Sequence, residues 1–329
     1  MAQTRDQTND LRRWLIRHLE PGEPLHVTLI RAHTNDVYRV ETGDRRLVLK
    51  VYGAGWRRDT EIRYEIDLLR HLAAQNIAVA SPIPGSDGDA LHHINLAGAT
   101  RQAVLFAYAD GEKPSPPFTT EMYRRQGMAT AALHRAADTF TSAHDRSPLD
   151  LACLIDRPLQ LITSLDIDDV ARDTLAAIAT FLRERITELA HRGLDWGACH
   201  GDLTFDNVHI TASGETVWYD FDSGGPGWRA IDLQGWALAS PERQADWRAF
   251  LDGYRSVRPL GDHDIATAPY MWLARVFWGI GVDLERRVLG EGEERMRAWL
   301  TARCAALTEA IRTIEQRSPP RHWSRRPTA

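Results

Sequence analysis

Cysteine, long apolar runs and lysine are all scarce in this 329-residue chain. The three cysteines, Cys153, Cys199 and Cys304, are too far apart in sequence for a disulfide framework or a clustered zinc site. No apolar run approaches the roughly 20 residues that a membrane-spanning helix needs, since the best one, 273–282, contains Arg275. The first ten residues, MAQTRDQTND, lack the apolar core of a signal peptide. We therefore expect a cytoplasmic protein with no membrane partner.

Only two of the 40 lysine and arginine residues are lysines, Lys50 and Lys113. Neither follows a glycine, which excludes the P-loop of Walker-type nucleotide-binding proteins. Because arginine supplies almost all of the positive charge, a retained lysine indicates a position that needs a compact ammonium group. Lys50 lies in the apolar run LVLKVY, so it is a candidate functional residue.

Charge is unevenly distributed along the chain. The formal net charge is −5, which argues against general nucleic-acid binding. Residues 1–111 carry equal numbers of acidic and basic side chains, whereas residues 112–316 carry nine more acidic than basic ones. An acidic second half suits metal ions or a cationic acceptor, although a solvated acidic surface has the same composition. The stretch 317–329 adds four arginines and no acid, and we expect it to be a disordered basic tail.

The apolar pattern divides the chain into a β-rich part and a helical part. After a short helix at 6–20, strand-like segments at 26–31, 37–41 and 47–52, a helix at 57–75 and strands at 90–96 and 102–108 are predicted. Helical periodicity then covers 119–144, 168–192, 241–254, 265–288 and 293–316. We predict an α+β protein with a small β-rich N-terminal lobe (1–106), a hinge (107–113) and a larger, mainly helical C-terminal lobe (114–316).

The segment from 199 to 232 gathers polar side chains suited to metal and phosphate chemistry. It contains CHGDLTFDN and, further on, WYDFD. A strand hairpin predicted at 208–210 and 216–221 would bring Asp220 back beside Asn207. Amide and carboxylate oxygens are the ligands that Mg²⁺ takes when phosphate supplies the rest. The sequence therefore predicts a magnesium site at the end of this hairpin.

These motifs are specific enough to indicate a family. HGDLTFDN resembles the H-x-D-x-x-x-x-N catalytic loop of the aminoglycoside phosphotransferase and choline kinase superfamily. YDFD resembles that superfamily's counterpart of the metal-binding Asp-Phe-Gly of protein kinases. The resemblance extends from about residue 25 to residue 310. It implies a bilobal, protein-kinase-like fold and transfer of phosphate from ATP, or alternatively GTP, with Mg²⁺.

The resemblance also implies roles for individual residues of the second half. Asp202 matches the catalytic aspartate that orients the acceptor hydroxyl. Asn207 and Asp220 match the two Mg²⁺ ligands. Three further residues are expected to support the site: His200, Asp222 and Asp232.

In the first half the resemblance implies a nucleotide-binding lobe. Lys50 matches the third-strand lysine that contacts the α- and β-phosphates, with Glu65 on the following helix as its partner and Glu61 as the alternative. The glycine-rich loop of protein kinases is absent, and Thr34 and Asn35 fit its position. The segment expected to bind adenine contains Phe106 and Tyr108.

Three functions remain open from the sequence. The first is phosphotransfer to a hydroxyl of a small molecule: an antibiotic such as an aminoglycoside, hence antibiotic resistance, or an amino alcohol or sugar metabolite. The second is a protein Ser/Thr kinase of the same fold. The third, a non-catalytic nucleotide-binding protein, predicts the loss of Lys50, Asp202, Asn207 or Asp220, and all four are present. The sequence leaves the acceptor and the oligomeric state open.

Overall fold

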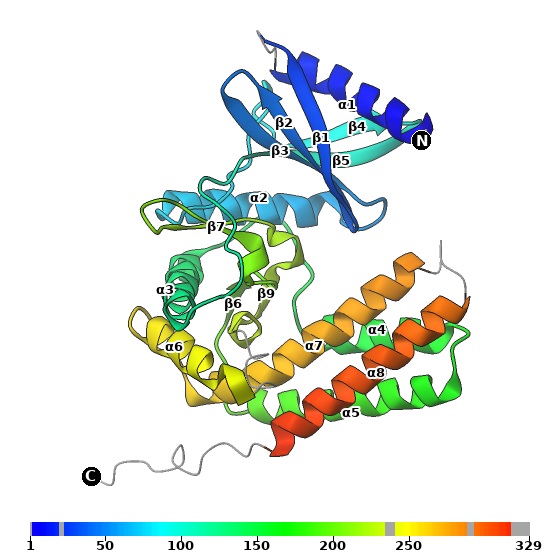
Figure 1. Ribbon diagram of the computed structural model, residues 1–329, viewed down its shortest axis with the longest axis vertical. Helices are drawn as coiled ribbons and strands as arrows, with labels where there is room; N and C mark the ends of the chain where they lie inside the picture. The colour runs from blue at the N-terminus through cyan, green and yellow to red at the C-terminus, as the bar shows by residue number, and fades with distance from the viewer. Residues whose placement is uncertain (1, 20–22, 234–240, 288–292, 317–329) are drawn as a thin grey trace. The chain divides into compact units, whose positions relative to one another are not determined.

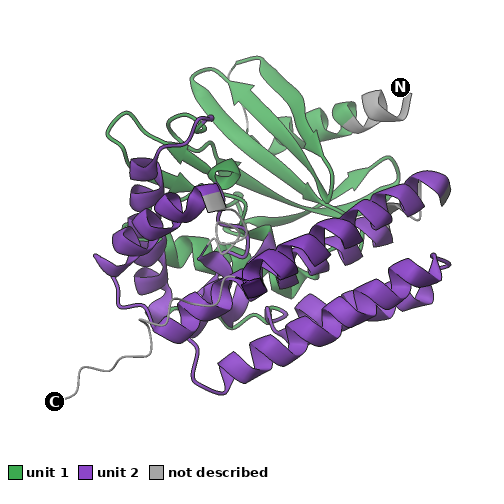
Figure 2. Cartoon of the chain, turned by 60° about the horizontal axis from the view of Figure 1, so that its bottom comes forward, with its two compact units in different colours: residues 1–114, 139–146, 205–222 green, residues 115–138, 147–204, 223–329 purple. Residues whose placement is uncertain are grey.

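The computed structural model describes residues 2–19, 23–233, 241–287 and 293–316 (Figure 1). The chain forms two compact units (Figure 2). Unit 1 contains residues 1–114, 139–146 and 205–222, and unit 2 contains residues 115–138, 147–204 and 223–329. Within the described ranges, every helix is too short or too polar to span a membrane. The tail expected at 317–329 lies outside the described residues, and the lobe and hinge bounds stay a prediction.

Unit 1 is built on a five-stranded antiparallel sheet with the strand order β1-β2-β3-β5-β4. The strands are β1 (Leu25–Ala32), β2 (Asn35–Thr42), β3 (Arg45–Tyr52), β4 (Leu91–Leu96) and β5 (Ala99–Ala107). All five were predicted from the sequence, with ends that differ by up to three residues.

Two helices lie on opposite sides of this sheet (Figure 1). Alternate residues of β2, β3 and β5 form a buried apolar cluster with Leu11 and Leu15 of α1 (Ala2–Leu19). Burying each such side chain contributes about 1.5–3 kcal/mol to folding. Because successive strand residues point to opposite faces, Lys50 lies on the other side, toward α2 (Asp59–Ala74). The strand period thus places this lysine outside the apolar cluster.

A hairpin from much later in the chain completes unit 1. Its strands are β7 (Val208–Ile210) and β8 (Thr216–Trp218), paired in antiparallel register. The predicted hairpin is confirmed, although its second strand ends at Trp218 rather than at 221. Trp218 is buried, and its main-chain groups bond to Ala78 and Ala80, both at 2.9 Å. These main-chain bonds attach the second strand of the hairpin to the segment that follows α2.

Unit 2 is mainly helical. Its α-helices are α3 (Thr120–Ala136), α4 (Arg157–Ser164), α5 (Asp169–Ala190), α6 (Gln244–Arg255), α7 (Asp262–Arg287) and α8 (Glu293–Gln316). Two short strands, β6 (Trp196–Cys199) and β9 (Gly225–Trp228), pair antiparallel. Gly127 and Gly253 allow helices α3 and α6 to approach closely, since a side chain at either position would clash with the main chain of the other helix. The expected α+β architecture is confirmed.

Two helix predictions are corrected. The helix predicted at 119–144 ends at Ala136 and continues only as a 3-10 turn, Ala137–Thr139. Within the remainder of the predicted range, the Ser142 hydroxyl donates to Asp67 and accepts the His144 N–H, a local bond of the kind that competes with helix. Conversely, residues 152–164 form a π-helical turn followed by α4, where no helix was predicted.

Candidate active site

Lys50 lies at the centre of the site residues in unit 1. It is only 5% exposed. Its Nζ donates to Glu65 Oε1 and to Asp220 Oδ1, both at 3.2 Å, and lies 4.0 Å from Asp222 Oδ1. Burial by itself lowers the pKa of the Lys50 ammonium, but the carboxylates of Asp222, Glu65 and Asp220 outweigh burial and raise its pKa well above its usual value. Lys50 therefore carries a fixed positive charge.

Glu65, rather than Glu61, is the partner of Lys50. Glu65 is buried on α2, and its Oε2 accepts a hydrogen bond from the Tyr52 hydroxyl at 3.0 Å. Glu61 is used at the start of the same helix, where its Oε2 accepts the Arg58 N–H at 3.1 Å. Tyr52 is a member of the site that sequence reasoning missed, although it ends the same apolar run as Lys50.

Asn207 and Asp220 flank the open end of the β7–β8 hairpin. The Asn207 carbonyl accepts the N–H of Tyr219 at 3.1 Å, which brings the two chain segments together as predicted. Asp220 has a φ of 64°, a left-handed conformation that non-glycine residues rarely adopt. Such strained residues concentrate at functional sites. The Asp220 carboxylate is 39% exposed, and its Oδ1 is held by Lys50.

The donors at this end of the hairpin fit a magnesium ion that phosphate completes. The Asp220 carboxylate and the Asn207 side-chain amide supply hard oxygen donors. Among the residues that the structure describes, no group of three or more His, Cys, Asp or Glu side chains could hold a metal by itself. A metal ion here would need phosphate and water oxygens, which is how Mg²⁺ is usually bound at nucleotide sites.

Asp222 is a buried anchor for the loops around Lys50. Its Oδ2 accepts from Asn35 Nδ2 at 2.9 Å and from Trp56 Nε1 at 2.7 Å, and its Oδ1 accepts from Arg57 Nε at 3.3 Å. Its main-chain carbonyl accepts from Arg57 Nη2 at 2.6 Å and from Arg146. Asp222 thus joins three segments of unit 1 that are distant in sequence, which suits the supporting role expected for it.

The charge of Asp222 is maintained by the cations around it. Burial raises the pKa of this carboxyl, but Lys50, Arg57 and Arg146 outweigh burial and hold its pKa well below its ordinary range. Trp56, Arg57 and Arg146 were not predicted as site residues. Their contacts with Asp222 join positions 76 to 166 residues apart, so no local pattern could have identified them.

Asn35 makes structural contacts within unit 1. Its Nδ2 donates to Asp222, its Oδ1 accepts the Gly53 N–H at 3.1 Å, and the residue is 8% exposed. Both polar groups of the Asn35 side chain are engaged, and they join the start of β2 to Gly53 and to Asp222. Thr34, beside Asn35, is only partly buried and contacts His33 Nδ1 at 3.0 Å through its hydroxyl. Nucleotide binding by Asn35 and Thr34 stays a prediction.

Phe106 and Tyr108 lie at the end of β5. Phe106 is buried and pairs with Val48 of β3. The Tyr108 N–H donates to the Arg46 carbonyl at 3.4 Å, and the Arg46 guanidinium lies 4.8 Å from the centre of the Tyr108 ring. Pairing with β3 therefore sets the main chain at this point, and a role in adenine binding stays a prediction.

In unit 2, one buried carboxylate holds the start of the predicted catalytic loop, residues 200–202. Asp232 accepts the main-chain N–H groups of His200 and Gly201, both at 2.8 Å. His200 is fully buried, and its Nδ1 accepts the N–H of Asp202 at 3.3 Å. These contacts suit the supporting roles expected for His200 and Asp232. The Asp202 side chain itself is 38% exposed.

Asp232 is in turn hydrogen-bonded to a buried histidine, His134. The His134 Nε2 lies 3.1 Å from Asp232 Oδ2, and its Nδ1 lies 2.8 Å from the Tyr254 hydroxyl. Burial lowers the pKa of His134 despite the carboxylate, so the ring is neutral. Burial raises the pKa of Asp232, but the His134 hydrogen bond and the His200 N–H outweigh it and lower the pKa. An ionised Asp232 and a neutral His134 are consistent with an Nε2–H donor.

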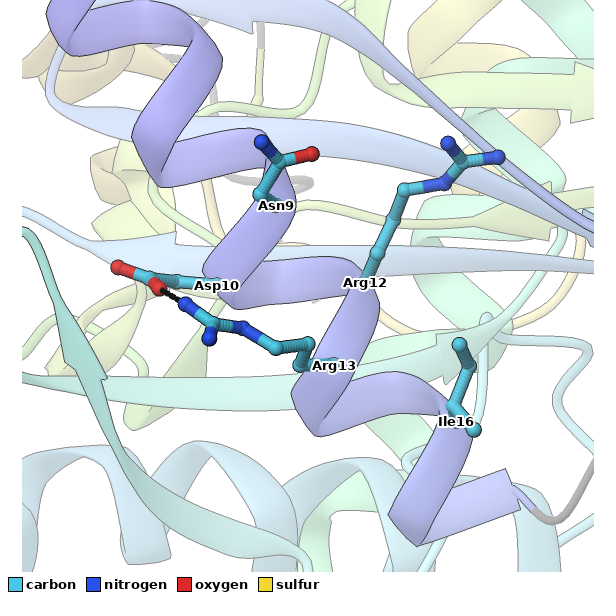
Figure 3. A pocket seen from close by; sticks show the side chains of 5 residues that line it. All are labelled: Asn9, Asp10, Arg12, Arg13 and Ile16. Carbon is cyan, nitrogen blue, oxygen red and sulfur yellow. Dashed lines mark hydrogen bonds and ion pairs between the residues drawn. The ribbon is translucent and has the colours of Figure 1, made fainter.

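A separate open hollow lies on the outer face of α1 (Figure 3). Its lining consists of Asn9, Asp10, Arg12, Arg13 and Ile16. Arg13 pairs with Asp10, and Arg12 Nη2 donates to the Leu25 carbonyl at 2.7 Å. None of the predicted site residues lines it, so we assign it no part in the site.

Comparison with known sequences identifies relatives of this chain. The model of the phosphotransferase enzyme family matches residues 26–260. An uncharacterized protein of Deinococcus radiodurans is 39% identical over 266 residues, which cover 78% of this chain and 76% of that protein. Homoserine kinase of Rhizobium rhizogenes is 26% identical over 291 residues, which cover 82% and 83% of the two chains.

Solved structures show the same fold. A microcompartment-associated aminopropanol kinase aligns with a TM-score of 0.73 at 23% identity, over 93% of this chain and 98% of that one. Amicoumacin kinase hAmiN, in complex with AMP-PNP, Ca²⁺ and Ami, aligns with a TM-score of 0.72 at 22% identity, over 92% and 93%. The expected protein-kinase-like fold is confirmed. The enzyme class expected from the sequence, a phosphotransferase with an alcohol group of a small molecule as acceptor, is confirmed. The family match spans Lys50, the motif HGDLTFDN and the hairpin, and this chain belongs to the phosphotransferase enzyme family.

Proposed function

We propose that this protein transfers the γ-phosphate of ATP, with Mg²⁺, to a hydroxyl group of a small molecule that also carries an amino group. GTP is the alternative donor. One observation carries the proposal: the buried, charged Lys50 is held between Glu65 and Asp220. An ammonium fixed beside a carboxylate that can bind a metal ion is the arrangement that kinases use to bind the phosphates of a nucleoside triphosphate.

The residues of unit 1 bind the nucleotide in this proposal. Lys50 donates to oxygens of the α- and β-phosphates, while Glu65 and Tyr52 keep its ammonium in place. Asn207 and Asp220 hold Mg²⁺, which when bound neutralises negative charge on the phosphates. No covalent chemistry falls to these side chains, so their contribution is positioning and charge stabilisation.

Asp202 of unit 2 acts on the acceptor. Its carboxylate accepts a hydrogen bond from the acceptor hydroxyl and orients the oxygen for in-line attack on the γ-phosphorus. The new O–P bond forms as the bond between the γ-phosphorus and the β–γ bridging oxygen breaks, and the hydroxyl proton passes to Asp202. We assign Asp202 and Asn207 to one reaction because only five positions separate them in the motif.

Two observations support an acceptor with an amino group. Aminopropanol and homoserine, the compounds in the names of two related kinases, each carry an amino and a hydroxyl group. The excess of acidic side chains in residues 112–316 favours a positively charged acceptor. Aminoglycosides have the same pair of groups and remain within the proposal.

An ATP-consumption screen tests the proposal. The panel contains 1-amino-2-propanol, ethanolamine, L-homoserine and aminoglycosides, with glycerol as the hydroxyl compound without an amine and casein as a protein acceptor. We expect Mg²⁺-dependent consumption with an amino-containing compound, and none with the matched variant Lys50→Met. Equal turnover with glycerol would contradict the amino requirement, and turnover with casein alone would favour a protein kinase. No turnover, together with no rise in Tm on adding ATP and Mg²⁺, would contradict phosphotransfer.

A further inference from the structure

We propose that Arg275 is a positioning residue that fixes the orientation of Asp202; this inference rests on the role proposed above for Asp202. Arg275 lies on α7, 74 residues after the catalytic loop. Its Nε donates to the Gly201 carbonyl at 2.9 Å, and its Nη2 lies 3.5 Å from Asp202 Oδ1. One guanidinium therefore contacts both the main chain and the side chain at the catalytic position.

The contact with Gly201 completes the restraint of one peptide group. The peptide between Gly201 and Asp202 has its C=O bonded to Arg275 and its N–H bonded to His200 Nδ1. The preceding N–H groups are bonded to Asp232. Because both polar groups of this peptide are held, its plane is fixed, and the plane sets the position of the Asp202 Cα. The contact of Arg275 Nη2 with Asp202 Oδ1 then restrains the direction of the side chain itself.

Gly201 itself has no alternative at this position. Its φ is 79°, and a side chain there would clash with the Ser223 carbonyl. A glycine has more accessible main-chain conformations than any other residue, so Gly201 by itself gives the chain before Asp202 little conformational preference. Contacts from other elements, such as the bond from Arg275 to the Gly201 carbonyl, are therefore needed to hold Gly201 in one conformation.

The guanidinium is itself held in place. Arg275 stacks over Trp278, one helical turn further along α7, with 4.7 Å between its Cζ and the ring centre. A planar fork can donate to two oxygens of adjacent residues at once, whereas the compact ammonium of lysine does so poorly. Arginine therefore suits this position because of the shape of its donor group as well as its charge.

Kinetics of three variants test the inference. Arg275→Met removes both donors, Arg275→Lys keeps the charge without the fork, and Tyr270→Phe is the control on the same helix, since it removes only a hydrogen bond to Glu315 of α8. We expect kcat to fall on the order of 10²-fold in Arg275→Met, as for a misplaced reacting group. The KM for ATP should stay near the wild-type value, Arg275→Lys should be intermediate, and Tyr270→Phe should keep its kcat.

Hydrogen–deuterium exchange gives a readout that needs no turnover. Peptides that span 199–206 should exchange faster in Arg275→Met than in the wild type or in Tyr270→Phe. A wild-type kcat in Arg275→Met would overturn the positioning role and leave the proposed function intact, provided that Asp202→Asn is inactive. If the wild type has no kinase activity, the proposed function fails and unchanged exchange overturns the restraint separately. If Arg275→Met does not fold, a wild-type kcat and exchange in Arg275→Lys overturn the need for the fork.

Discussion

The two units stabilise their site residues in different ways. In unit 1, buried side chains of both signs surround Lys50 and Asp222, and each charge is held by several others. In unit 2, the N–H groups of His200 and Gly201, at the start of the predicted catalytic loop, are held by one buried carboxylate, Asp232, whose partner His134 is neutral. Asp202 is left 38% exposed.

This difference separates stability from catalysis. Removing one member of a buried ionic network leaves the others uncompensated, which destabilises a protein strongly. A partly exposed carboxylate whose neighbours are fixed through the main chain can be changed with little effect on folding. We therefore expect substitutions in the unit 1 network to lower stability, and substitution of Asp202 to affect the reaction alone.

The largest effect is expected for Asp202→Asn. Its kcat should fall by about 10²–10⁴-fold, because the amide cannot accept the hydroxyl proton. Its Tm and its affinity for ATP with Mg²⁺ should match those of the wild type, since Asp202 is half-exposed. Steady-state kinetics, nucleotide titration and thermal unfolding check this. A loss of nucleotide affinity equal to that of Asp220→Asn would instead place Asp202 in the metal site.

The second prediction concerns Asp222→Asn. Its free energy of unfolding should fall by about 3–5 kcal/mol, because the substitution removes the buried charge that faces Lys50 and Arg57. The matched control is Asp206→Asn, the same change in unit 1 at a side chain that is 81% exposed and pairs with Lys113. Such an exposed pair contributes about 1 kcal/mol or less. Equal effects in urea denaturation would contradict the comparison.

The same variant should change the dependence of stability on pH. The pKa of Asp222 in the folded protein lies below its ordinary value of 3.8. Its contribution is therefore complete above pH 3.8 and is lost as the pH falls from there toward the folded pKa. Below pH 3.8 the unfolding free energy of the wild type should fall more steeply than that of Asp222→Asn. Parallel curves would show that folding does not lower the pKa of Asp222.

The smallest effect is expected for His134→Gln, and it too appears in the pH dependence. Burial lowers the pKa of His134 below its ordinary value of 6.5. Below pH 6.5 the unfolded chain binds a proton at His134 that the folded protein does not, so stability falls as the pH falls. The slope is at most about 1.4 kcal/mol per pH unit for one group. The variant should lose this part of the slope, which urea denaturation between pH 5 and 7.5 measures.

Residues with a local signature were predictable. The five strands of unit 1 follow from apolar alternation, and the hairpin at 208–218 from two short apolar runs around a turn. Lys50 was identified because lysine is rare here and because it interrupts an apolar strand. The motif HGDLTFDN is continuous in sequence, so Asp202 and Asn207 could be proposed as site residues without a structure.

The partner of Lys50, Glu65 or Glu61, was predictable only in part. Both face similar directions one turn apart on α2, so spacing alone left the partner of Lys50 open. The tertiary structure decided it, because Glu61 bonds to Arg58 at the start of the helix while Glu65 meets Lys50 and Tyr52.

The amino-acid sequence by itself determined the strands of unit 1, the hairpin and the motifs that indicate the family, because those depend on neighbours within a few positions. Only the tertiary structure decided what holds them. The bond from Asn35 to Asp222 joins positions 187 residues apart, and that from Arg275 to Gly201 joins positions 74 apart. Such contacts have no period or spacing along the chain, because they arise from how separate elements pack and not from the conformation of any one of them.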